Sequence, residues 1–111
     1  MPPREKRGER VERERDVELA LVGAVEQEGG LCLKFSSPSR RAVPDRLCLL
    51  PGGRIFFVEC KAPGKVPTRA QSYFHTILRN LGFEVFVVDS VLRAESMVVD
   101  RDWETNPPSR Q

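Results

Sequence analysis

A short turn sequence, Pro-Gly-Gly at positions 51–53, separates two largely apolar runs, Arg46–Leu50 and Ile55–Cys60. Proline and glycine in a brief connection between two such runs predict a β-hairpin. Because side chains alternate between the two faces of a strand, residues two positions apart share a face. Glu59 and Lys61 should therefore project together from one face of the second strand.

The register of this hairpin decides whether Asp45 lies on that face as well. A two-residue loop at positions 52–53 would place Asp45 opposite position 60, on the other face. A three-residue loop at positions 52–54 would place Asp45 opposite Lys61 and diagonal to Glu59, so that all three groups share a face. A site built from these residues requires a loop of odd length or a bulge, unless Asp45 lies before regular pairing begins.

Hydrophobic periodicity predicts further elements around the hairpin. They are a helix over 13–27, a strand over 31–35, a helix from an N-cap at Thr68 to about Leu81, a strand over 83–88 and a last helix over 90–99 capped by Ser90. The buried faces of the first two helices are expected to be Val17, Leu21, Ala24 and Val25, and Phe74, Ile77, Leu78 and Leu81. The order α-β-β-β-α-β-(α) predicts an α/β fold, a small mixed sheet flanked by helices.

The length of 111 residues suits one domain, expected over 13–100, between a charged flexible arm at 1–12 and a loose tail at 101–111. No apolar run approaches the ~20 residues needed to cross a bilayer, and no signal peptide is evident. A cytoplasmic protein is expected. The net charge of +2 is too small to indicate nucleic-acid binding by itself.

Cysteine and histidine usage argues against a zinc site. Cys32, Cys48 and Cys60 form no CxxC pair and lie in apolar runs, where they should act as small core residues. His75 is the only histidine and is expected on the surface of its helix. Oxygen ligands, and hence Mg²⁺ or Mn²⁺, remain open.

Basic residues gather in two stretches of the chain. Ser37, Arg40 and Arg41 lie in a stretch without acids from position 32 to 44, and Lys65 and Arg69 follow the third apolar run. These side chains could face phosphates of DNA, although Arg40 and Arg41 could equally be ordinary solvated loop residues.

Two close carboxylates beside a lysine are costly unless a cation offsets their repulsion. Glu-x-Lys alone is a common pattern on exposed strands, where it forms a solvated salt bridge. Here the neighbours Phe56, Phe57, Val58 and Cys60 indicate a buried strand, and charges at the end of such a strand require a reason.

Several short motifs follow one another over about residues 14–92. They are Glu18 on the first helix, Gly29-Gly30 before a strand, Pro44-Asp45-Arg46, Leu-Pro-Gly-Gly at 50–53, Glu59-Cys60-Lys61, the loop 62–67, Gln71 on the next helix, and Gly82-x-x-Val85. In this order they resemble the stand-alone virus-type replication-repair nuclease (VRR-NUC) domain, a branch of the PD-(D/E)xK nuclease superfamily.

The resemblance implies a metal-dependent endonuclease that hydrolyses phosphodiester bonds in DNA. Asp45 and Glu59 would bind Mg²⁺ or Mn²⁺, joined by the backbone carbonyl of Cys60. Metal-bound water has a lowered pKa, and the metal neutralises charge that develops on the phosphate.

Three further catalytic roles follow from the same resemblance. Glu18 would reach the metal directly, through water or by way of a second metal, although spacing does not firmly choose it over Glu14 or Glu26 on neighbouring turns. Lys61 would act on the attacking water; the nearby carboxylates favour its charged form, so we expect it to orient the water and stabilise charge rather than serve as the base. Gln71 would steady this site or a DNA phosphate.

Relatives of this type suggest a homodimer that cuts branched DNA such as four-way (Holliday) junctions, in a bacterial or phage-infected cell. One alternative is a nicking or flap nuclease that acts on other DNA structures. Another is a DNA-binding module that has this fold but does not cleave. The presence of Asp45, Glu59 and Lys61 together weighs against the last possibility.

Overall fold

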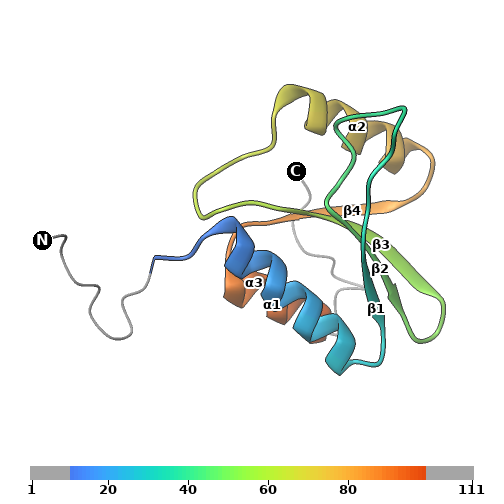
Figure 1. The fold of residues 1–111 in the computed structure, drawn as a ribbon. Coiled ribbons are helices and arrows are strands. Elements are labelled where there is room, and N and C mark those ends of the chain that lie inside the picture. Colours follow the sequence, from blue (N-terminus) through green and yellow to red (C-terminus); the bar gives the residue numbers. More distant parts are fainter. Residues whose placement is uncertain (1–10, 100–111) are drawn as a thin grey trace, which may run out of the picture.

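The computed structural model describes residues 11–99 (Figure 1). Seven elements follow one another as the sequence predicts. They are α1 (Glu14–Gln27), β1 (Leu31–Lys34), β2 (Arg46–Leu50), β3 (Arg54–Cys60), α2 (Arg69–Asn80), β4 (Glu84–Val88) and α3 (Val91–Val99). The strands form one sheet in the order β1-β2-β3-β4. Pairing is antiparallel from β1 to β3 and parallel between β3 and β4, so the prediction of a small mixed sheet is confirmed.

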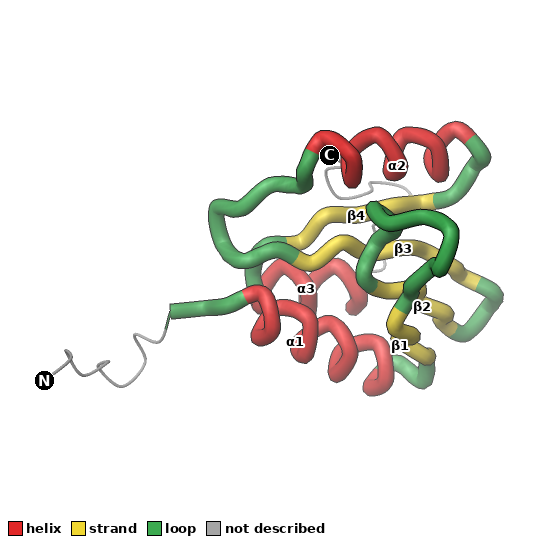
Figure 2. The backbone as a smooth tube through the Cα atoms, turned by 45° about the horizontal axis from the view of Figure 1, so that its top comes forward, coloured by secondary structure: helices red, strands yellow, loops and turns green. Residues whose placement is uncertain are grey.

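The helices cover the two faces of the sheet unequally. Figure 2 shows α1 and α3 side by side on one face and α2 alone on the other. None of the helices within residues 11–99 is long and apolar enough to cross a membrane. The termini of the chain, residues 1–10 and 100–111, lie outside the described part, so the predicted arm and tail are not tested.

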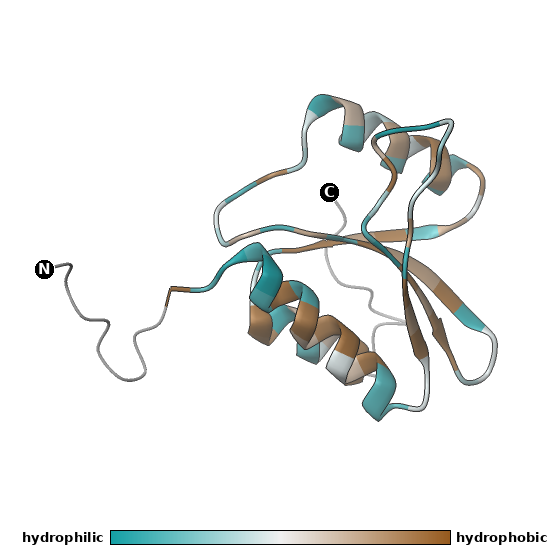
Figure 3. Ribbon diagram, viewed as in Figure 1, coloured by the Kyte–Doolittle hydropathy of each residue, from teal (hydrophilic) through white to brown (hydrophobic). Residues whose placement is uncertain are grey.

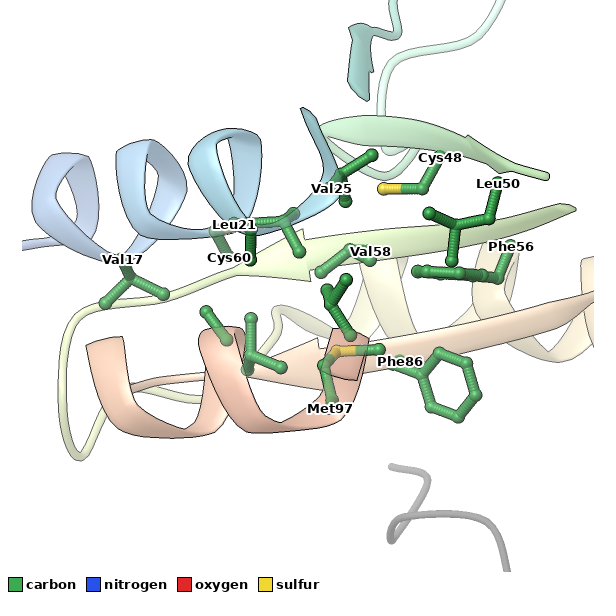
Figure 4. Close-up of a cluster of buried hydrophobic side chains, with 14 residues drawn as sticks. Val17, Leu21, Val25, Cys48, Leu50, Phe56, Val58, Cys60, Phe86 and Met97 are labelled. Atoms are coloured by element: carbon green, nitrogen blue, oxygen red, sulfur yellow. The ribbon is translucent and has the colours of Figure 1, made fainter. Parts of the chain in front are cut away.

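The hydrophobic core lies between the sheet and the pair α1 and α3 (Figure 4). Val17, Leu21, Ala24 and Val25 of α1 are all buried, as their spacing predicts. They meet Cys48, Leu50, Phe56, Val58, Cys60, Phe86 and Val88 from the sheet, and Ala94, Met97 and Val98 from α3. The hydropathy colouring in Figure 3 shows the same apolar strands and helix faces meeting in this layer.

The cysteines take the core roles expected of them. Cys48 and Cys60 are buried, Cys32 packs against the core, and all three thiols are free. Free cysteine commonly behaves as a small buried hydrophobe.

Local capping sets the ends of the helices on both faces. Thr68 accepts a hydrogen bond from the backbone of Gln71, and the Gln71 side chain accepts one from the backbone N–H of Thr68. This reciprocal pair is a capping box, which satisfies two backbone donors that the helix leaves free. Ser90 caps α3 through the N–H of Arg93, as predicted, and Glu12 accepts a hydrogen bond from the N–H of Val91. Glu12 thus contacts the folded domain.

The hairpin has an odd-length loop, as the site requires, but one residue earlier than positions 52–54. Leu50 pairs with Arg54, so the loop comprises positions 51–53, and both glycines have positive φ (88° and 79°). Arg54 pairs within the strand instead of belonging to the loop. Since Arg46 lies opposite Val58, the next position brings Asp45 opposite Glu59 and not opposite Lys61.

Two expectations for α2 are wrong. Leu81 is exposed instead of buried, because it forms the C-cap beyond the last residue of the helix. His75 is fully buried instead of lying on the surface. The helix turns a partly polar side toward the sheet, with Leu78 as its well-buried apolar residue.

Candidate active site

Strand β3 places two opposite charges at its end, on the sheet face that α2 covers. The Glu59 side chain is 1% exposed and the Lys61 side chain 13%. Lys61 Nζ lies 3.1 Å from Glu59 Oε2. The backbone N–H of Lys61 donates to the carbonyl of Val88, so the parallel pairing with β4 extends to this residue and fixes its position. The shared face predicted from the spacing of two residues is confirmed.

Asp45 approaches the same place from the start of β2, directly after the buried Pro44. Its Oδ2 accepts a 2.8 Å hydrogen bond from the backbone N–H of Cys60, which ties the carboxylate to the end of β3. Burial raises the pKa of Asp45 to about 6, and the charges of Glu59 and Glu18 act in the same direction, whereas the hydrogen bond from Cys60 opposes them. The two carboxylates therefore repel each other in a partly dry environment.

Gln71 joins this cluster from the first turn of α2. Its Nε2 donates a 3.1 Å hydrogen bond to Glu59 Oε2, while its Oε1 is engaged in the capping box with Thr68. One side chain thus fixes the start of the helix and contacts the buried carboxylate. The predicted association of Gln71 with the carboxylate cluster is present in the structure.

His75 is the residue of this cluster that the sequence reasoning missed. Its Nε2 lies 3.8 Å from Glu59 Oε1, and its side chain is fully buried. A signal was available, because His75 follows Gln71 by four positions and residues i and i+4 lie on the same helix face. Once Gln71 is placed against the sheet, His75 must face it too.

Glu18 is engaged in a different contact. Its Oε2 accepts a 2.8 Å hydrogen bond from Arg46 Nε, in an ion pair that is part-buried on the α1 side of the sheet. Arg46 also donates to the carbonyl of Cys32. Within residues 11–99, His, Cys, Asp and Glu side chains form no group of three or more arranged to hold a metal ion. A metal-binding role for Glu18 therefore stays a prediction.

The five candidate DNA contacts lie in the two loops next to α2 and at its first residue. Arg40 stacks over the ring of Phe74 at 5.0 Å, which places the loop 36–44 against α2. Ser37 forms a 3.3 Å hydroxyl contact with Ser39. The side chains of Arg41, Lys65 and Arg69 are exposed. The structure thus leaves these basic side chains open to solvent in the two loops and at the start of α2, and their contact with DNA stays a prediction.

Comparisons with known proteins identify the family. No family model matches the sequence. The chain is 53% identical over 81 residues to "Putative nuclease p44" of Acyrthosiphon pisum secondary endosymbiont phage 1, across 73% of this chain and 87% of that protein. A solved structure described as "VRR_NUC domain" superposes with a TM-score of 0.73 at 34% identity, covering 79% of this chain and 96% of that one. Fold and sequence agree, and the chain belongs to the VRR-NUC domain family.

Proposed function

We propose that this protein is a metal-dependent endonuclease that hydrolyses phosphodiester bonds in DNA, in the cytoplasm of a bacterial or phage-infected cell. The observation that carries the proposal is the meeting of Asp45, Glu59 and Lys61 at the end of one hairpin. The relative named as a nuclease and the likeness to the solved domain support the same activity.

The carboxylate pair fits a divalent cation in two respects. Glu59 Oε1 is buried and, among the described residues, has no hydrogen-bond partner. Burial and the charges of Glu59 and Glu18 raise the pKa of Asp45, and the hydrogen bond from Cys60 offsets this only in part. Oxygen donors of this kind suit Mg²⁺ or Mn²⁺, which commonly bind through one or two carboxylates, waters and substrate phosphate. Asp45 and Glu59 would hold the ion, with the carbonyl of Cys60 as a further ligand.

The metal, when bound, would supply an activated water and neutralise charge on the scissile phosphate. Lys61 lies beside Glu59, with Nζ 3.1 Å from Oε2, and would orient the water and stabilise developing negative charge. Gln71 keeps the Glu59 carboxylate in place from α2. The DNA backbone would be positioned beside the carboxylates by four basic side chains, those of Arg40, Arg41, Lys65 and Arg69.

The decisive experiment is incubation of the full chain with linear, nicked, flap and four-way-junction DNA. Each substrate is tested with Mg²⁺ or Mn²⁺ and with EDTA, beside Glu59→Ala as the inactive control. We expect cleavage that requires metal and is abolished by the substitution. Binding to DNA without cleavage would favour the non-cleaving module. Absence of metal-dependent cleavage on every substrate would overturn the proposal that the protein is a nuclease.

We propose further that the protein is selective for branched DNA and acts as a homodimer, because a four-way junction needs two cuts. The sheet offers an apolar surface for a second copy. Leu31 and Ile55 both lie opposite Leu49 in the ladder, so they share a face, and Leu33 lies two residues along the same face. These three side chains are 57%, 49% and 43% exposed. Exposed apolar patches of this kind often mark protein interfaces.

The dimer is tested by sedimentation equilibrium of the wild type and of Leu33→Lys. Lysine on this face should disrupt the association, because burying its charge in the interface without a partner costs free energy. We expect a dimer for the wild type and a monomer for the variant, with preference for junction over linear DNA reduced in parallel. A wild type that is monomeric at concentrations above those of the cleavage assay would contradict the dimer.

A further inference from the structure

Behind the carboxylate cluster, two buried polar groups face each other without hydrogen-bond partners among the described residues. One is Glu59 Oε1, and the other is the imidazole of His75, neither of whose nitrogens has a partner. Nε2 is the nitrogen that faces the carboxylate, at 3.8 Å. Burying a polar group without a hydrogen bond is costly, so a fully buried histidine in this position requires an explanation.

The chemistry of the two groups decides which form of the imidazole belongs here. An ionised carboxylate can only accept hydrogen bonds, so the nitrogen that faces it must carry a hydrogen. The separation of 3.8 Å is beyond the 2.7–3.2 Å range of a hydrogen bond, but it is too short for a bridging water. Approach by less than about 1 Å would satisfy both orphaned atoms directly.

We propose that His75 is a positioning residue for Glu59, whose Oε1 it holds through Nε2–H while Gln71 and Lys61 hold Oε2. A carboxylate offers about four acceptor positions. Three protein donors from two elements then fix its orientation and leave one position free. In the proposed nuclease, on which this last step rests, that remaining position is the one a divalent cation would take.

The contact itself can be tested without any enzymatic assay. His75 is the only histidine in the sequence, so the imidazole signals of the full, tag-free chain belong to one residue. Long-range ¹H–¹⁵N correlation spectra should show the Nε2–H tautomer. Glu59→Gln should shift these signals, whereas Val58→Ala, on the other face of the same strand, should leave them nearly unchanged. An Nδ1–H tautomer, or signals insensitive to Glu59→Gln, would overturn the proposal.

The consequence for function is tested with His75→Leu and His75→Gln. Leucine fills a similar space without a donor, and glutamine restores an N–H near the position of Nε2. Removal of a group that orients a metal ligand commonly costs 10–100-fold in metal affinity or activity. We expect about that loss in Mn²⁺ affinity by calorimetry and in kcat for His75→Leu, with KM for DNA unchanged and most of the loss recovered in His75→Gln.

Three outcomes separate the possibilities. If His75→Leu binds Mn²⁺ and cleaves DNA as the wild type does, histidine does not position Glu59. If leucine and glutamine are equally harmful and both lower the melting temperature strongly, the role of His75 is packing, and the proposal fails. If the wild type neither binds Mn²⁺ nor cleaves DNA, the proposed function fails, and the imidazole spectra alone decide whether His75 holds Glu59.

Discussion

The two faces of strand β3 differ in what surrounds their buried side chains. Toward α1 and α3, Phe56, Val58 and Cys60 are fully buried among apolar side chains. Toward α2, Glu59 is as buried as these neighbours, yet its contacts are Lys61, Gln71 and His75. One face is a packed core, whereas the other ends in a polar cluster around Glu59 that contains orphaned atoms.

This difference shows that one side of the sheet mainly stabilises the fold, whereas the other carries the candidate site. Apolar burial on the α1 and α3 side lowers the free energy of the folded state directly. The polar cluster contributes little net stability, because desolvation of its charges offsets their attraction. A group that folding leaves incompletely satisfied is available to a ligand, and we expect substitutions on the two faces to have opposite signatures.

The largest effects should come from substituting two neighbouring residues of β3 whose side chains lie on opposite faces. Glu59→Gln removes the charge of a proposed metal ligand and should lower kcat by about 100-fold or more, since removing even an outer-shell partner of such a ligand commonly costs 10–100-fold. Val58→Ala should lower the free energy of unfolding by about 2 kcal/mol and leave kcat per folded molecule unchanged. Cleavage assays and urea denaturation measure the two quantities. A Val58→Ala protein that is fully stable but inactive would break the comparison.

An intermediate effect should separate the two roles of Gln71. Glutamate also serves in a capping box, so Gln71→Glu keeps the start of α2 but replaces the donor to Glu59 with a second negative charge. We expect kcat to fall by about 10–100-fold, with some loss of stability because the new carboxylate repels the buried Glu59.

The matched control for that substitution is Thr68→Ala, which removes the capping hydroxyl. It should cost about 1 kcal/mol of stability and change kcat by less than a few-fold. Denaturation curves and steady-state kinetics of both variants are the measurement. Equal loss of activity in the two variants would show that Gln71 acts only through the helix.

The smallest effect should be the contribution of Asp45 to the pH dependence of the protein's stability. Its pKa in the folded protein, about 6, lies above the ordinary value of 3.8, so the folded state binds more protons than the unfolded state between these values. This carboxyl therefore makes stability fall as pH rises from about 4 to about 6. Asp45→Asn removes the contribution while keeping an oxygen for the N–H of Cys60.

We accordingly expect the melting temperature of Asp45→Asn to exceed that of the wild type by a few degrees at pH 7 and to match it near pH 4. Mn²⁺ should narrow the gap at pH 7 by stabilising only the wild type. Thermal unfolding across pH is the measurement. An Asp45→Asn protein that is less stable than the wild type at pH 7 would mean that the carboxylate stabilises the fold.

Much of the fold could be predicted because its signals are local. The spacing of Val17, Leu21 and Val25 defines one helix face, and Thr68 and Ser90 mark the starts of two helices. Such signals act over a few residues of chain. The shared face of Glu59 and Lys61 follows from strand alternation in the same way.

The sequence by itself therefore determined the elements, their order and the pairing of Glu59 with Lys61. The tertiary structure alone decided that the loop spans 51–53 and brings Asp45 opposite Glu59, and that Glu18 pairs with Arg46. Each of these depends on contacts between segments far apart in the chain, where a shift of one residue in register or a rotation of one helix changes the partner. Local periodicity carries no information about that choice.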